Sequence, residues 1–159
     1  MNQTEISVKI ILDRWDASIK NLTSLLENLS DAALMKEIVP GKNRGIYLIG
    51  HLIAVHDDML RLLDMGEKQY PELYEPFIKT PDNVNTAMPS LIDLRKMCIE
   101  QTNYLKQKFD KLSAIEWFDK HTAVTSDEFK TEPHRNKLNI IVTRTSHLQY
   151  HLGQLQLLK

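Results

Sequence analysis

Four long segments of this chain place apolar residues in alternating steps of three and four, and this spacing most constrains the fold. The pattern covers residues 8–29, 48–62, 91–112 and 138–155. Such steps put apolar side chains on one stripe of an α-helix, because the helix has about 3.6 residues per turn. No pair of segments shows the apolar and polar alternation expected of β-strands. The sequence therefore predicts an all-α protein built as a four-helix bundle.

The links between these helices are rich in turn-forming residues. Residues 30–44, 66–88 and 113–134 all contain proline, and the second of these links carries no long helical stripe. The third helix is expected to begin near Pro89, because proline suits a first helical turn. We expect the whole chain, residues 1–159, to be a single domain.

Composition excludes several classes of function. Lys plus Arg is 20 and Asp plus Glu is 21, so the basic excess typical of nucleic-acid binding is missing. No polybasic block predicts an anionic membrane as partner. Residues 1–16 mix charges into apolar positions, unlike a signal peptide or a membrane span. A single cysteine, Cys98, excludes an internal disulfide and suits the cytoplasm, where we expect the protein to act.

Three histidines are the candidate functional residues. His147 and His151 lie four apart in RTSHLQYHLGQLQLLK, which puts both on one face of the fourth helix. His51 lies on the apolar stripe of the second helix, in GIYLIGHLIAVHDDML, and should face the interior. A lone histidine near a core stripe is usually a hydrogen-bonded structural residue. Three on facing helices would bury several polar nitrogens, which one metal ion can satisfy together.

The histidine positions also constrain the topology. His51 lies roughly 10 Å along the second helix, and the fourth-helix pair lies eight to twelve residues before the last residue. If the two helices are antiparallel, His51 and the fourth-helix pair lie at the same level along the bundle axis. If the helices are parallel, these levels differ by roughly 10 Å. Antiparallel packing needs one long crossover, and residues 66–88 can span a bundle of roughly 30 Å. We predict an up-down-down-up bundle with a long crossover between helices 2 and 3.

Two segments resemble a known family. RTSHLQYHLGQ resembles the carboxy-terminal H-x-x-x-H-x-G-Q signature of the DinB-like superfamily, and GHLIAVHDDM resembles its second-helix histidine segment. The resemblance implies a four-helix bundle with a crossover, a homodimer, and a divalent metal site with His51, His147 and His151 as ligands. It also implies kinship with bacterial thiol-dependent transferases of the bacillithiol transferase group. The specific part of the match is short: the three histidines, Gly153 and Gln154.

Ligand type narrows the metal and the chemistry. Three imidazoles without a thiolate favour zinc or nickel over iron or manganese. Three protein ligands leave at least one position for water or a substrate. A bound water could be acidified for hydrolysis, or the open position could take a substrate thiolate. We expect a small-molecule substrate, with a low-molecular-weight thiol as one candidate, and the reaction stays open between a thiol S-transferase and a hydrolase.

The sequence supports a functional role less strongly for residues near the three histidines. Gln154 either orients a ligand or is a satisfied polar helix residue, and Gly153 either permits close helix packing or clears space at the site. Arg144 could attract an anionic substrate, although a surface salt bridge is the more frequent role. Asp58 lies roughly 10 Å beyond the second-helix histidine, too far to share an ion. The remaining histidines are predicted not to be ligands: His56, His121 and His134.

Two non-catalytic alternatives remain open. The protein could bind a metal in order to sense or store it, or it could be a bundle with a vestigial site that associates with a partner. The intact triad argues against the second alternative. The lack of a carboxylate base beside the triad keeps the first one open.

Overall fold

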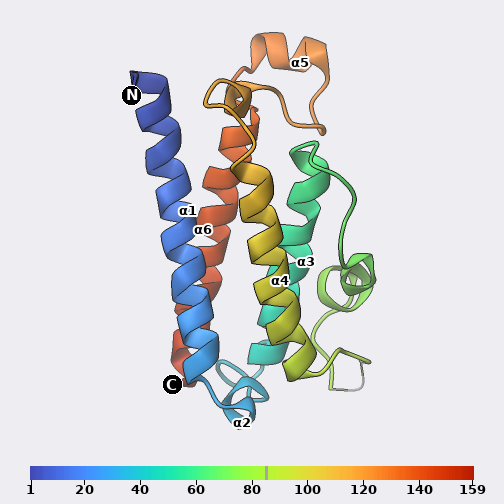
Figure 1. Cartoon of the computed structure of the whole chain (residues 1–159). Helices are drawn as coiled ribbons and strands as arrows, with labels where there is room; N and C mark the ends of the chain where they lie inside the picture. Colours follow the sequence, from blue (N-terminus) through green and yellow to red (C-terminus); the bar gives the residue numbers. More distant parts are fainter. Residues whose placement is uncertain (85) are drawn as a thin grey trace.

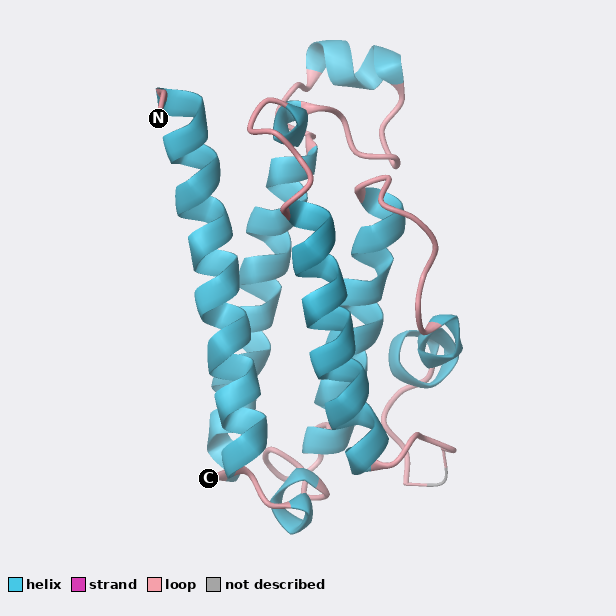
Figure 2. Cartoon of the chain, in the orientation of Figure 1, coloured by secondary structure: helices cyan, strands magenta, loops and turns pink. Residues whose placement is uncertain are grey.

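Helices dominate the computed structural model, which describes residues 1–84 and 86–159. Figure 2 shows that helices and loops make up the described chain, which has no strand. Four long helices lie side by side in Figure 1: α1 (Gln3–Asn28), α3 (Gly45–Leu62), α4 (Leu91–Phe109) and α6 (Lys137–Leu155). The predicted all-α class is confirmed.

The long helices run in two directions. In Figure 1, α1 and α6 run from the upper end of the molecule to the lower end, and α3 and α4 run the opposite way. Helix α6 packs against both α1 and α3, and α3 also packs against α4. Residues 63–84 and 86–90, called the α3–α4 link below, return along the outside of α3 to the end where α4 begins (Figure 1). Helices α3 and α6 are therefore antiparallel neighbours.

Short helices occupy the connecting segments. The α3–α4 link contains the 3-10 helix η1 and the π-helix η2, which the apolar pattern of residues 66–88 did not predict. Both are one-turn pieces, too short to show a stripe. In the described residues, the short helices are α2 (Asp31–Leu34), η1 (Pro71–Leu73), η2 (Glu75–Lys79), η3 (Glu116–Phe118), α5 (Ser126–Thr131) and η4 (Gln156–Leu158).

Polar side chains fix several helix ends. The hydroxyl of Ser90 accepts a hydrogen bond from the Asp93 amide at 3.1 Å, and α4 begins at Leu91, close to the start predicted near Pro89. A serine cap satisfies an amide that would otherwise lack a partner, and this sets the boundary. At the far end of α1, the guanidinium of Arg95 donates to the carbonyls of Leu26 and Leu29.

Side chains of α3 hold the α3–α4 link along much of its length. Asp57 accepts hydrogen bonds near the start of the link, and Asp82 forms an ion pair with Arg44 near its end. The side chains of this pair are only 10% and 7% exposed. Three α3 residues and Arg44, which directly precedes the helix, make these contacts: Asp57 to Gln69 and Tyr70, His51 to Phe77, Tyr47 to Thr80, and Arg44 to Asp82. The link is therefore fixed to the helix that carries one of the three candidate histidines.

The core lies between the long helices and beneath the link. Trp15 from α1, Phe77 from the link and Trp117 from η3 are all almost completely buried. Cys98 is buried as well, and burial raises the pKa of its thiol to about 11, which suits a core residue better than a reactive one. None of the described helices is both long enough and apolar enough to cross a membrane.

Candidate metal centre

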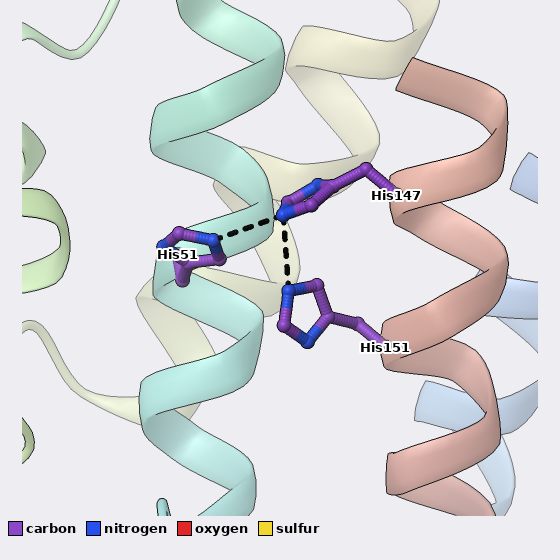
Figure 3. Close-up of side chains that lie close together, drawn as sticks. All are labelled: His51, His147 and His151. Carbon is purple, nitrogen blue, oxygen red and sulfur yellow. Dashed lines mark hydrogen bonds between the residues drawn. The ribbon is translucent and has the colours of Figure 1, made fainter. Parts of the chain in front are cut away.

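The three histidines converge between α3 and α6. Figure 3 shows His51 on α3 pointing toward His147 and His151 on α6. The Nε2 atom of His147 lies 3.2 Å from Nε2 of His51 and 3.1 Å from Nε2 of His151. One ligand atom from each residue lies within 4.8 Å of the others. The structure thus brings together the three histidines that the sequence singled out. Because His51 and His147 are only half-buried, solvent reaches one side of the cluster.

Hydrogen bonds at the outer nitrogens orient two of the rings. Nδ1 of His51 lies 2.9 Å from the carbonyl oxygen of Phe77, and Nδ1 of His151 lies 2.7 Å from Oε1 of Gln154. Both oxygens can only accept, so each Nδ1 carries the hydrogen and each neutral ring keeps a free lone pair on Nε2. Gln154 also donates from its amide nitrogen to the Tyr150 hydroxyl, which fits this orientation of the amide.

These tautomers fit a bound cation. The lone pairs on Nε2 of His51 and His151 both face the Nε2 atom of His147. His147 could donate a hydrogen to only one of them, because a neutral imidazole has a single N–H. A metal ion would accept all three lone pairs, and His147 would then carry its hydrogen on Nδ1. That atom is buried and has no hydrogen-bond partner in the described chain.

The electrostatics favour the neutral form of the two histidine rings on α6. Burial, followed by the charges of His151, His51 and Arg144, lowers the pKa of His147 to about 4. Burial also lowers the pKa of His151, although the hydrogen bond that His151 donates to Gln154 acts in the opposite direction. Only a neutral imidazole can donate a lone pair to a metal. The two α6 rings therefore have lone pairs available at neutral pH, with little competition from protons.

A glycine next to His51 permits the contact with Phe77. A Cβ atom added to Gly50 would lie 2.3 Å from carbon atoms of the fully buried Phe77 ring. Any larger residue at position 50 would push Phe77, and with it the carbonyl that orients His51. Sequence reasoning missed both residues. A glycine inside the α3 stripe, where it weakens a helix, was the available signal.

The structure corrects the interpretation of Gly153. A Cβ atom added there would meet no atom within 4 Å, so close helix packing does not explain this glycine. Gly153 lines a cavity of about 500 Å³ beside α1, together with Asn21, Ser24 and Gln149. None of the three clustered histidines lines this cavity, so Gly153 does not clear space at the triad either.

Arg144 also differs from the prediction. It forms no surface salt bridge: the guanidinium is half-buried, and its Nε is buried with no partner in residues 1–84 and 86–159. The reason is its position on the inner stripe of α6, three residues before His147. The nearby acid, Asp58, is instead paired with Lys68 at 3.0 Å.

The other histidines lie outside the cluster, as predicted. His56 is buried against the Trp15 ring, with 4.9 Å between ring centroids, and burial lowers its pKa to about 3. His121 and His134 lie in the link between α4 and α6. Within the described residues, the group that could hold a metal consists of His51, His147 and His151, with no carboxylate.

Fold and cluster together define an all-helical protein with a three-histidine site between two antiparallel helices. The family model of the DinB superfamily matches residues 14–155, and the chain belongs to that superfamily. It is also similar to a conserved protein of Enterococcus faecalis known from a crystal structure, with 14% identity and a TM-score of 0.61. The match covers 98% of this chain and 94% of that one, and at this identity it shows the fold alone. A comparison with curated proteins finds no match.

Proposed function

We propose that this chain is a metal-dependent enzyme that acts on a small molecule at an ion held by His51, His147 and His151. The observation that carries the proposal is the convergence of three Nε2 atoms, two of them on rings whose outer nitrogen is already hydrogen-bonded. Membership of the DinB superfamily supports a divalent metal. Three protein ligands leave a coordination position open, as in catalytic sites.

Within this proposal, the groups around the histidines have distinct roles. The Phe77 carbonyl and Gln154 hold the rings in the ligating tautomer, a task that outer hydrogen bonds commonly perform at metal sites. Lewis-acid activation of a water or of a thiolate is the chemistry that such an ion supplies when bound. We propose zinc or nickel, and either S-transfer from a low-molecular-weight thiol or hydrolysis.

The proposal also includes the architecture around the site. We interpret the chain as a single-domain four-helix bundle of up-down-down-up topology, with the α3–α4 link as its crossover. The directions of the long helices support this interpretation (Figure 1). A homodimer that acts in the cytoplasm completes the proposal, on the family resemblance and the single cysteine described above.

A metal-binding role without catalysis is the second candidate. One observation favours it: no carboxylate of the described chain joins the cluster as a potential proton acceptor. Such a protein would bind the ion and show no metal-dependent turnover. The two candidates therefore share the metal site and differ only in the assay that follows loading.

Metal analysis of protein purified without an affinity tag tests the site. We expect one ion per chain in wild type, and a sharp loss in His51→Ala, His147→Ala and His151→Ala, because two imidazoles bind far more weakly than three. His134→Ala, at an exposed histidine outside the cluster, should keep full stoichiometry. If His51→Ala retained a full ion at limiting metal, the triad would be wrong.

Activity assays on the same preparations then separate the candidates. Thiol conjugation and ester hydrolysis are measured on metal-free protein and on protein reloaded with zinc or nickel. Turnover that depends on the metal and is lost in the triad variants supports the enzyme. Full loading without turnover toward a broad set of electrophiles and esters favours the binding protein.

A further inference from the structure

Arg144 is a half-buried positive charge without a partner in the described part of the chain. Its side chain is half-buried, its Nε is buried, and no hydrogen bond or ion pair to it occurs within the described part of the chain. Burial is the main influence on the guanidinium and lowers its pKa. Because an arginine still carries its charge under these conditions, the fold bears an uncompensated desolvation cost at this position.

The position of Arg144 connects it to the histidine cluster. Arg144, His147 and His151 follow one another at spacings of three and four on α6, which places them on one face of the helix. Arg144 is thus one turn, about 5 Å along the axis, from the nearer histidine. Its charge contributes to lowering the pKa of His147 and of the buried His56.

The charges around Arg144 leave it free for an external anion. Asp58 is the acid whose charge acts on Arg144, yet it forms its ion pair with Lys68 at 3.0 Å, with the lysine side chain only 14% exposed. Asp58 is therefore already paired with another cation. A half-buried cation beside the cluster, without a fixed counter-ion, is suited to bind the anionic group of a ligand.

We propose that Arg144 binds the carboxylate group of the small molecule that this site accepts, and so sets its specificity for carboxylate-bearing substrates. The inference rests on the proposed function, which it deepens by naming a substrate class. A guanidinium meets a carboxylate through two parallel hydrogen bonds, and a single cation matches its single negative charge. A phosphate group, with nearly two negative charges, would call for further free cations, and the nearby Lys68 is already paired.

Acetate binding tests the assignment with a defined probe. Wild type, Arg144→Gln and Arg144→Lys are loaded with cobalt(II), the metal content is measured, and acetate is titrated while the cobalt absorption spectrum is recorded. Acetamide, a neutral molecule of the same shape, serves as ligand control. Arg14→Gln removes an exposed arginine on α1 and serves as matched variant. The same titrations on metal-free protein follow the midpoint of thermal unfolding.

The expected results separate a ligand contact from a structural role. Arg144→Gln should bind acetate about tenfold more weakly than wild type, which is the loss of one charge-assisted contact. Arg144→Lys should have an acetate affinity between those of wild type and Arg144→Gln, because lysine keeps the charge but lacks the two parallel N–H donors of the guanidinium. Arg14→Gln should bind acetate as wild type does. In metal-free protein, acetate should raise the unfolding midpoint of wild type and not of Arg144→Gln. Without acetate, Arg144→Gln should be at least as stable as wild type.

Two outcomes overturn the proposal. The first is equal acetate binding by wild type and Arg144→Gln. The second is a marked drop in the unfolding midpoint of Arg144→Gln without acetate, which would show that the guanidinium supports the fold. If wild type takes up no cobalt, the proposed function fails by itself, and the unfolding titration of metal-free protein still decides the role of Arg144.

Discussion

The two helices that carry the histidines hold them in different ways. On α6, His151 is oriented by Gln154, three residues further along the same helix. On α3, His51 is oriented by the backbone carbonyl of Phe77, which lies 26 residues away in the α3–α4 link. The α6 half of the site is therefore built locally, and the α3 half depends on the link being docked. The two halves should fail under different perturbations.

Releasing the link should have the largest effect. Asp82→Ala leaves the buried guanidinium of Arg44 without its partner and should cost about 3 kcal/mol of unfolding free energy. Asp13→Ala, which breaks an exposed pair on α1, should cost less than about 0.5 kcal/mol. Denaturant unfolding gives both values. Hydrogen exchange should show faster exchange at Gln69 and Thr80 in Asp82→Ala, with α6 unchanged. Equal protection in both variants would show that the ion pair does not hold the link.

Substitutions of Gly50 on α3 and Gly153 on α6 test the same comparison between the two helices. Gly50→Ala should destabilise the fold by about 2 kcal/mol through overpacking against Phe77, and should weaken metal binding at least about tenfold by displacing the acceptor of His51. Gly153→Ala meets open space and should stabilise α6 by up to about 1 kcal/mol, with unchanged metal affinity. Unfolding and competitive metal titration measure both effects. If the two variants had the same metal affinity, the link would not orient His51.

Acid should weaken the metal-free fold through its buried histidines. The pKa of His56 is lowered to about 3, so the folded state keeps this ring neutral while the unfolded chain binds a proton below about pH 6.5. The stability is therefore complete above that pH and falls as the pH drops toward 3, by at most about 1.4 kcal/mol per pH unit for this residue. His56→Leu should have a shallower slope in urea unfolding between pH 6.5 and 4. An unchanged slope would mean that His56 is charged or exposed in the fold.

Removing the hydrogen bond between His151 and Gln154 should have the smallest effect, limited to α6. Gln154→Ala removes the acceptor for Nδ1 of His151 and should reduce metal affinity by about tenfold, at the lower end for outer hydrogen bonds at metal sites. Hydrogen exchange in the α3–α4 link should not change, because Gln154 contacts residues of its own helix. Faster exchange at Gln69 would contradict the independence of the two halves.

This contrast also explains what the sequence could predict. Helical periodicity identified the all-α class, and a spacing of four residues placed His147 and His151 on one face, because both patterns are local. The second-helix stripe identified His51 as their facing residue. The Phe77 carbonyl could not be predicted, since every residue has a carbonyl and only the docked link determines which one reaches Nδ1.

Misread residues share the same cause. For Arg144, the sequence favours a surface salt bridge over the attraction of an anionic substrate, because it does not reveal that the guanidinium is half-buried or that the nearby Asp58 pairs with Lys68 from the link. For Gly153, the sequence indicates either close helix packing or space for the site. In the structure, Gly153 instead faces an open cavity that residues of α1 also line. In each case, the deciding neighbour comes from a distant part of the chain.

The 96-residue separation between His51 and His147 has a consequence for how the chain acquires its site. During synthesis, α3 and the link emerge well before α6, so the link can dock and set the His51 tautomer while two of the three ligands do not yet exist. A partly folded chain therefore presents only part of the cluster: His51 alone if only α3 is formed, or His147 and His151 if only α6 is formed. On the proposed function, we expect high metal affinity to arise in a single late event, when α6 packs against α3. An ion bound there would close the long loop between these helices, as a reversible cross-link does.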